Sequence, residues 1–236
     1  MPEYEWVHES EWKPEKNELI EIIKEVQNIL RDRFTFQYEF IGSSRRNMIT
    51  RVVNGNSGYD FDANLHVNLE KTAVRYKPKR LKPMFIDAFN TVCQKYGYDY
   101  CEDSTRVITI KKKDRKNSRI ICSCDFAIVR GEEDQKEYIL HNKSAGEYQW
   151  VKQSRDYLNL EEKAEMIKEA GCWNEVREIY LNKKKRFAPA KKSRALYAES
   201  VNEVFEKVCS VHDPIQKFYN YGNSGVILEI NRIAGN

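Results

Sequence analysis

The stretch "SRIICSCDFAIVR" (118–130) decides the fold, because it is the most β-rich segment of the chain and carries one acid among apolar residues. Asp125 shares a strand face with Ser123 and Ala127, whereas Cys124 and Phe126 face the opposite way. A lone carboxylate in such a strand is costly unless it is paired or bound to a metal. Asp125 is therefore a candidate site residue.

A second stretch, "YDFDANLHVNL" (59–69), alternates apolar and polar residues, which is typical of a half-buried strand. Because residues i and i+2 of a strand point the same way, Asp60 and Asp62 face one side together and Phe61 faces the other. Two carboxylates this close repel each other, which exposed strands usually avoid. The pair is either a solvated strand end or a site for a divalent cation such as Mg²⁺, which prefers oxygen ligands.

If these two strands are neighbours, the carboxylates of Asp60, Asp62 and Asp125 converge. Such a cluster suits two metal ions, one activating an attacking hydroxyl and the other holding a triphosphate and the leaving group.

A turn between two of the expected strands could bind phosphate. The aromatic strand "FTFQYEFI" (34–41) runs into Gly42, Ser43 and Ser44. A strand that ends in Gly-Ser and leads into a short helix offers backbone N–H groups and a hydroxyl to phosphate oxygens, and glycine lets the backbone approach closely. Arg45 and Arg46 either add positive charge to this cradle or begin a solvated helix.

The order of strand, Gly-Ser turn, helix, Asp-x-Asp strand and later Asp strand resembles the polymerase-beta-like nucleotidyltransferase superfamily over roughly residues 35–130. The resemblance implies that Gly42 and Ser43 form the phosphate-binding turn, with Ser44 beside them. It implies that Asp60 and Asp62 are paired metal ligands and that Asp125 is the third carboxylate. Sixteen residues separate Ser43 from Asp60, a few more than the family usually has, and we assign the excess to the flexible "NGNSG" (54–58).

The activity implied is transfer of a nucleoside monophosphate from a nucleoside triphosphate to a hydroxyl, with release of pyrophosphate. Two Mg²⁺ or Mn²⁺ ions would act together with the bound triphosphate. Catalysis of this kind is mostly positioning and charge neutralisation, so no histidine base is required. A non-catalytic nucleotide- or RNA-binding module that keeps the fold is the main alternative, and a metal-dependent phosphatase or nuclease is a third.

The apolar periodicity predicts an α/β (α+β) fold, a mixed sheet with flanking helices followed by a mostly helical C-terminal region. One helix stripe is expected after Pro14, from Leu19 to Leu30, and another around Phe85 that ends at Gly97. We expect a catalytic core at residues 1–147 and a helical domain at 148–236 that closes over the nucleotide. Trp150, at their junction, is either a base-stacking residue or a core residue.

Composition limits the partners. Charged residues make up 32% of the chain, with a net charge of +4. Three basic runs, at 71–82, 106–119 and 183–194, are either solvated surface or contacts for a polyanion, so RNA and small molecules both stay open as acceptors. The six cysteines include no Cys-x-x-Cys pair, and no signal peptide or membrane-length apolar run is present. We therefore expect a cytoplasmic protein with reduced, buried thiols, no disulfide partner and no membrane contact.

Overall fold

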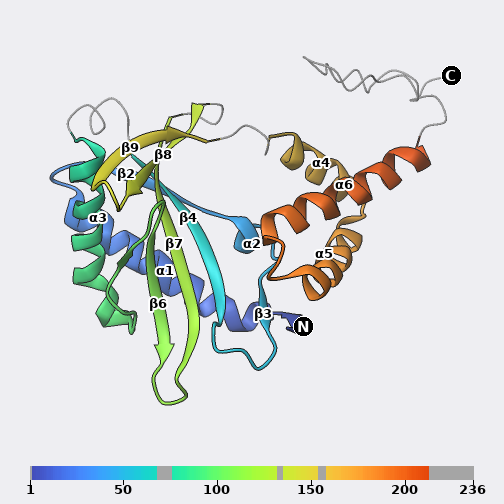
Figure 1. The fold of residues 1–236 in the computed structure, drawn as a ribbon, viewed down its shortest axis with the longest axis horizontal. Coiled ribbons are helices and arrows are strands. Elements are labelled where there is room, and N and C mark those ends of the chain that lie inside the picture. The colour runs from blue at the N-terminus through green and yellow to red at the C-terminus, as the bar shows by residue number, and fades with distance from the viewer. Residues whose placement is uncertain (1, 68–75, 132–134, 154–157, 213–236) are drawn as a thin grey trace.

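The structure is a computed structural model that describes residues 2–67, 76–131, 135–153 and 158–212 of the 236-residue chain. Its centre is a mixed sheet with the strand order β2-β4-β7-β6-β5, and β8 and β9 extend it from β7 (Figure 1). Strands β4 and β7 run parallel, and every other neighbouring pair in this sheet is antiparallel. The expected mixed α/β sheet is confirmed. The strands are β2 (Phe36–Ile41), β4 (Tyr59–Val67), β5 (Glu102–Asp103), β6 (Ile108–Asp114), β7 (Arg119–Arg130), β8 (Glu137–Asn142) and β9 (Glu147–Lys152).

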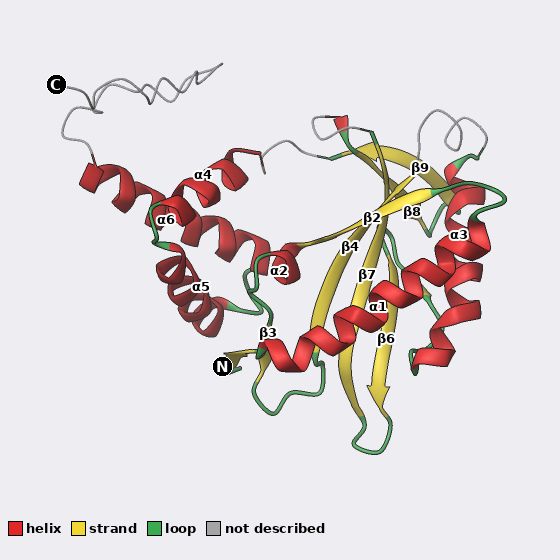
Figure 2. Cartoon of the chain, turned by 180° about the vertical axis from the view of Figure 1, so that it is seen from behind, coloured by secondary structure: helices red, strands yellow, loops and turns green. Residues whose placement is uncertain are grey.

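Two helices, α1 (Glu9–Leu30) and α3 (Pro78–Val92), cover one face of the sheet (Figure 2). The apolar stripe of α1 packs into this core, as predicted, with each of its residues 2% exposed or less: Leu19, Ile22, Ile23, Val26 and Leu30. From α3, Phe89 stacks on Phe126 of β7 with ring centroids 4.5 Å apart. A short 3-10 helix, η2 (Cys93–Tyr96), follows α3 and ends at Gly97, as expected. Because the apolar sides of β4 and β7 are buried here, their polar sides face away from α1 and α3.

Helix α1 begins at Glu9, before the apolar stripe expected after Pro14, and it contains Pro14. The side chain of His8 accepts a hydrogen bond from the first turn, and the Glu11 side chain accepts one from the His8 backbone. This reciprocal cap stabilises the additional turn before Pro14. The side chain of Trp12 is also buried, which anchors that turn to the core.

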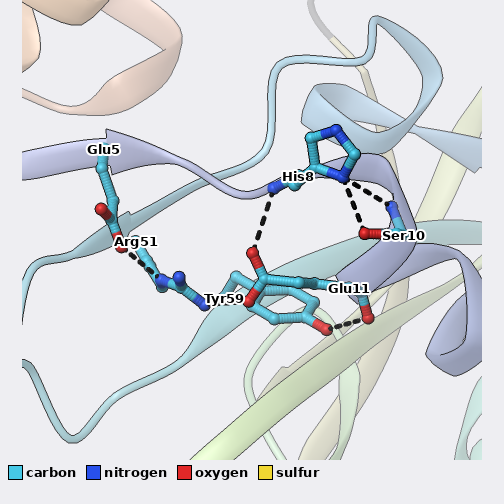
Figure 3. A network of polar contacts seen from close by, with 6 residues as sticks. All are labelled: Glu5, His8, Ser10, Glu11, Arg51 and Tyr59. Atoms are coloured by element: carbon cyan, nitrogen blue, oxygen red, sulfur yellow. Dashed lines mark hydrogen bonds and ion pairs between the residues drawn. The ribbon is translucent and has the colours of Figure 1, made fainter.

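A polar network fixes the start of β4 (Figure 3). Strand β1 (Tyr4–Trp6) pairs with β3 (Thr50–Val52). Arg51 of β3 lies 2.7 Å from the Glu5 carboxylate and 2.6 Å from the Glu11 carboxylate. The Tyr59 hydroxyl donates to the Glu11 backbone carbonyl at 3.2 Å. The long interval between Ser43 and Asp60 thus contains a strand of its own, β3, besides the 54–58 turn.

The last described part of the chain is helical, as predicted, and consists of α4 (Leu158–Glu169), α5 (Trp173–Phe187) and α6 (Ser193–His212). Its core includes Val176, Leu196 and Val201, and Met48 from the segment after α2 (Gly42–Arg45) packs into it. Trp6 of β1 stacks on Tyr180 of α5, at 6.1 Å between centroids. The sheet extends through β9 to Lys152, past the boundary expected at residue 148.

None of the described helices combines the length and apolar character needed to cross a bilayer.

Candidate active site

The register of the central strands brings the three predicted aspartates together. In the parallel pair of β4 and β7, Asp62 lies opposite Asp125 and Asp60 lies opposite Ser123. Residues that face each other across two strands share a face of the sheet. The neighbouring Phe61, Cys124 and Phe126 are fully buried on the other face, under α1 and α3. The carboxylates therefore occupy the open, polar face.

Two hydroxyl groups orient two of these carboxylates. Thr109 of β6 pairs with Asp125 in the sheet, and its hydroxyl donates to the Asp125 carboxylate at 2.5 Å. Ser123 donates to the Asp60 carboxylate. Sequence patterns did not identify Thr109, because its place beside Asp125 depends on the pairing of β6 with β7. Only knowledge of that register would have revealed it.

The three acids are electrostatically unbalanced. Burial, followed by the charges of Asp125 and Asp60, raises the pKa of Asp62 to about 6, and the charge of Arg46 opposes this rise. Burial also raises the pKa of Asp125, although the Thr109 hydrogen bond opposes that effect. Nearby like charges and loss of hydration both disfavour the ionised carboxylate. A bound cation would remove both penalties.

The Gly-Ser turn lies directly against Asp62. Gly42 begins the four-residue helix α2 with φ of +66°, and a Cβ at this position would lie 2.7 Å from the Asp62 carboxylate oxygen. Any other residue would therefore be strained and would clash with Asp62. Ser44 is buried and its hydroxyl donates to the Ile41 carbonyl at 3.1 Å, so it holds the turn. Ser43 is partly exposed, and its backbone carbonyl accepts a 2.8 Å bond from Met48.

Arg46 joins this turn to the helical region. Its guanidinium lies 2.8 Å from the Glu161 carboxylate of α4 and 4.1 Å from the ring centroid of Tyr197 on α6. The same charge lowers the pKa of Asp62. Arg46 thus contacts the helices and also acts electrostatically on the carboxylates.

Lys184 brings a second cation from α5. Its Nζ donates to the Thr50 hydroxyl at 2.5 Å and lies 4.9 Å from the Tyr4 ring centroid. Burial lowers the pKa of Lys184, and the charge of Asp60 opposes this change. The sequence placed Lys184 only in a basic run. Helical spacing supplied a signal, because Lys184 follows the buried Tyr180 by four positions and shares its face.

Trp150 lies elsewhere on the sheet. It belongs to β9, opposite Ile139 of β8, and the Arg130 guanidinium lies 4.4 Å from its ring centroid. Arg130 is five positions beyond Asp125 on β7, roughly 16 Å along a strand. The structure does not bring Trp150 to the three aspartates. Trp150 is partly buried and packs against the hydrophobic core, as expected of a core residue.

The donor set fits a magnesium ion by its chemistry, since three carboxylates supply hard oxygen ligands and repel one another without a cation. The carboxylates of Asp60, Asp62 and Asp125 do not, however, surround one position that a metal ion could occupy. Among the residues that the structure describes, no group of three or more His, Cys, Asp or Glu side chains is close enough together to hold a metal ion. Asp60 and Asp125 are held instead by Ser123 and Thr109.

No protein-family model matches the chain, and a search of curated proteins finds no match. Solved structures do match. The GTP-bound form of Vibrio cholerae DncV aligns with a TM-score of 0.53 at 15% identity, over 85% of this chain and 52% of that one. The chain has a DncV-like fold.

Two further DncV structures from Vibrio cholerae align with the chain over a similar extent. The cyclic AMP-GMP synthase with a linear intermediate aligns at a TM-score of 0.53 and 14% identity, over 85% of this chain and 54% of that one. A variant of the di-nucleotide cyclase has two aspartates, two positions apart, replaced by alanine. It aligns with a TM-score of 0.54 at 13% identity, over 82% of this chain and 54% of that one. The chain spans about half the length of these structures.

Proposed function

We propose that this protein is a metal-dependent nucleotidyltransferase that moves a nucleoside monophosphate from a nucleoside triphosphate to a hydroxyl group and releases pyrophosphate. The observation that carries the proposal is the placement of Asp62 opposite Asp125, on the open face of a DncV-like sheet, with Gly42 packed against Asp62. Carboxylates in adjacent strands, where like charges contribute to the raised pKa of Asp62 and of Asp125, suit a site that binds cations together with phosphate.

In this proposal Asp60, Asp62 and Asp125 would hold two Mg²⁺ or Mn²⁺ ions. When bound, such ions would supply neutralisation of the triphosphate charge and activation of the acceptor hydroxyl. The role that we assign to Asp125, whose pKa is raised by burial, is to accept the proton of that hydroxyl. The backbone of Gly42 and the hydroxyl of Ser43 contact the triphosphate, and Arg46 and Lys184 add positive charge beside it.

The comparisons support a triphosphate donor and leave the acceptor open. The DncV structures carry GTP in one case and the linear intermediate 5' pppA(3',5')pG in another, which contains a nucleotide joined to a second nucleotide. For this chain the acceptor hydroxyl belongs either to RNA or to a small molecule such as a nucleotide. The paired basic residues favour a small acceptor, because Lys111, Lys112 and Lys113 each lie within 2.6 Å of a carboxylate.

The test is incubation of the protein with each α-labelled triphosphate and Mg²⁺ or Mn²⁺, alone and with cellular RNA. We expect labelled product from the wild type, and a loss of at least about a hundredfold in Asp125→Asn, since charge neutralisation by the metals carries most of such catalysis. Asp87→Asn is the matched control, because Asp87 lies on α3, on the other side of the sheet. Equal product from the wild type and Asp125→Asn would overturn the proposal.

A non-catalytic nucleotide-binding module is the second candidate, favoured by the carboxylates' lack of a closed metal-binding arrangement. Thermal melting with ATP or GTP, with and without Mg²⁺, separates the two functions. A metal-dependent enzyme should show a rise in melting temperature that requires both Mg²⁺ and triphosphate and that Asp62→Asn removes. A module should show a rise with triphosphate alone.

A further inference from the structure

A buried hydroxyl lies beside Asp125, on a strand that carries none of the three aspartates. Strand β6 pairs with β7 so that Thr109 lies opposite Asp125. The neighbours of Thr109 along β6, Ile108 and Ile110, are fully buried in the core under the helices. Strand alternation therefore turns Thr109 to the face that carries the carboxylates. Thr109 is only 8% exposed, so little water competes for its hydroxyl.

This hydroxyl holds one oxygen of the carboxylate and leaves the other. Thr109 Oγ1 donates to Asp125 Oδ1 at 2.5 Å. Asp125 Oδ2 makes no hydrogen bond or ion pair with any residue that the structure describes. A carboxylate held through one oxygen keeps its orientation and can still bind a ligand through the second. The same arrangement recurs beside it, where Ser123 donates to Oδ1 of Asp60.

The bond is not needed to join the strands. Strands β6 and β7 already pair through their backbones from Ile108 to Asp114. What the side-chain bond adds at Thr109 is the direction of the Asp125 carboxylate. Hydrogen bonds from neighbouring groups orient the carboxylates that bind metals, and their loss typically weakens metal binding or activity by about 10- to 100-fold.

We propose that Thr109 is a positioning residue of the metal site, whose hydroxyl holds Asp125 in the orientation in which it binds a metal ion. The inference rests on the proposed function, because it requires Asp125 to be a metal ligand. It adds that the affinity for the metal depends on a group that does not itself bind the ion.

The experiment titrates the folded protein with Mn²⁺ alone and measures the free ion by electron paramagnetic resonance, at about pH 8 so that the carboxylates are ionised. Thr109→Val keeps the branched shape and the strand preference of the side chain but removes the hydroxyl. We expect it to weaken Mn²⁺ binding by about 10- to 100-fold. Thr109→Ser keeps the hydroxyl and should bind Mn²⁺ as the wild type does. Equal weakening in both variants would show that packing matters instead, and would overturn the proposal.

Two further variants separate this inference from the proposed function, and circular dichroism verifies that each is folded. Asp125→Asn should weaken Mn²⁺ binding at least as much as Thr109→Val. Thr91→Val, which removes an exposed hydroxyl of α3, should leave it unchanged. If Asp125→Asn weakens binding while Thr109→Val matches the wild type, the positioning role is wrong and the proposed function stands. If the wild type binds no Mn²⁺, or Asp125→Asn binds it equally well, both proposals are wrong.

Discussion

Asp103 and Asp62 are both partly buried acids of one sheet, yet their surroundings are opposite. Around Asp103, on β5, Lys82 lies at 2.7 Å and the His141 imidazole at 2.9 Å. Around Asp62, on β4, burial and then the charges of Asp125 and Asp60 raise the pKa, and the charge of Arg46 opposes them. The structure therefore neutralises one carboxylate internally and leaves the other in need of a cation.

The difference separates a structural acid from one that we propose binds a ligand. The Asp103 cluster joins α3, β5 and the β8–β9 hairpin, since Tyr148 of β9 stacks on His141 and its hydroxyl donates to Asp103 at 3.4 Å. The Asp62 cluster lies on β4 and β7, with Thr109 of β6 beside Asp125, and these strands already pair through their backbones. A cluster that costs stability without holding elements together is best explained by ligand binding.

Breaking the Asp103 cluster should have the largest effect on stability. Lys82 is 1% exposed, and its Nζ also donates to the Ser104 carbonyl at 2.5 Å. Lys82→Met leaves the Asp103 charge without its main partner, so we expect a loss of about 3 kcal/mol in the free energy of unfolding, measured with urea. Lys79→Met, at an exposed position of the same helix, should change it by less than about 0.5 kcal/mol. Equal values for the two variants would show that the buried pair contributes nothing.

Removing one charge from each cluster should change stability in opposite directions. The pKa of Asp62 is about 6 in the folded protein and 3.8 as its ordinary value, so the folded state holds the proton more tightly. Stability should then fall as the pH rises from about 4 to 6, with the penalty fully present above that range. Asp62→Asn should flatten this slope and stabilise the protein at pH 7.5 by about 1–2 kcal/mol, allowing for partial exposure.

Asp103→Asn is the matched comparison, and it should destabilise the protein because Lys82 then lacks its counter-charge. Urea unfolding of both variants between pH 4 and 8 measures the two effects. A loss of stability in both variants would mean that Asp62, too, is a structural residue.

The smallest effect concerns Arg46, whose charge acts on Asp62. The Arg46 charge lowers the pKa of Asp62, so Arg46→Gln should raise that pKa further, by a fraction of a pH unit. Carboxyl ¹³C NMR titration measures it directly. Arg45→Gln is the control, because Arg45 is exposed and pairs with Glu39 at 2.8 Å. An unchanged Asp62 titration in Arg46→Gln would show that the arginine serves only to hold Glu161 and Tyr197.

The basic runs show that a charge pattern in the sequence does not predict which of its side chains are buried or paired. Lys82 and Lys184 lie in runs that looked like solvated surface or RNA contacts. Lys82 is instead buried against Asp103, and Lys184 of α5 donates to Thr50, with the charge of Asp60 acting on its pKa. A run of lysines records charge along the chain, and its sequence does not say which side chains face acids from distant elements. Helical spacing from the buried Tyr180 was the one local clue for Lys184.

The sequence by itself determined the strands of the core, the apolar stripe of α1, the shared face of Asp60 and Asp62, and the isolated acid Asp125. Side-chain alternation and helical periodicity are local properties, so they can be read without knowing what packs against them. Tertiary structure alone decided that β4 lies parallel to β7 with Asp62 opposite Asp125, that Thr109 binds Asp125, and that Trp150 lies far along the sheet. Strand partners and register depend on the packing of whole faces across long loops, and no short stretch of sequence contains that information.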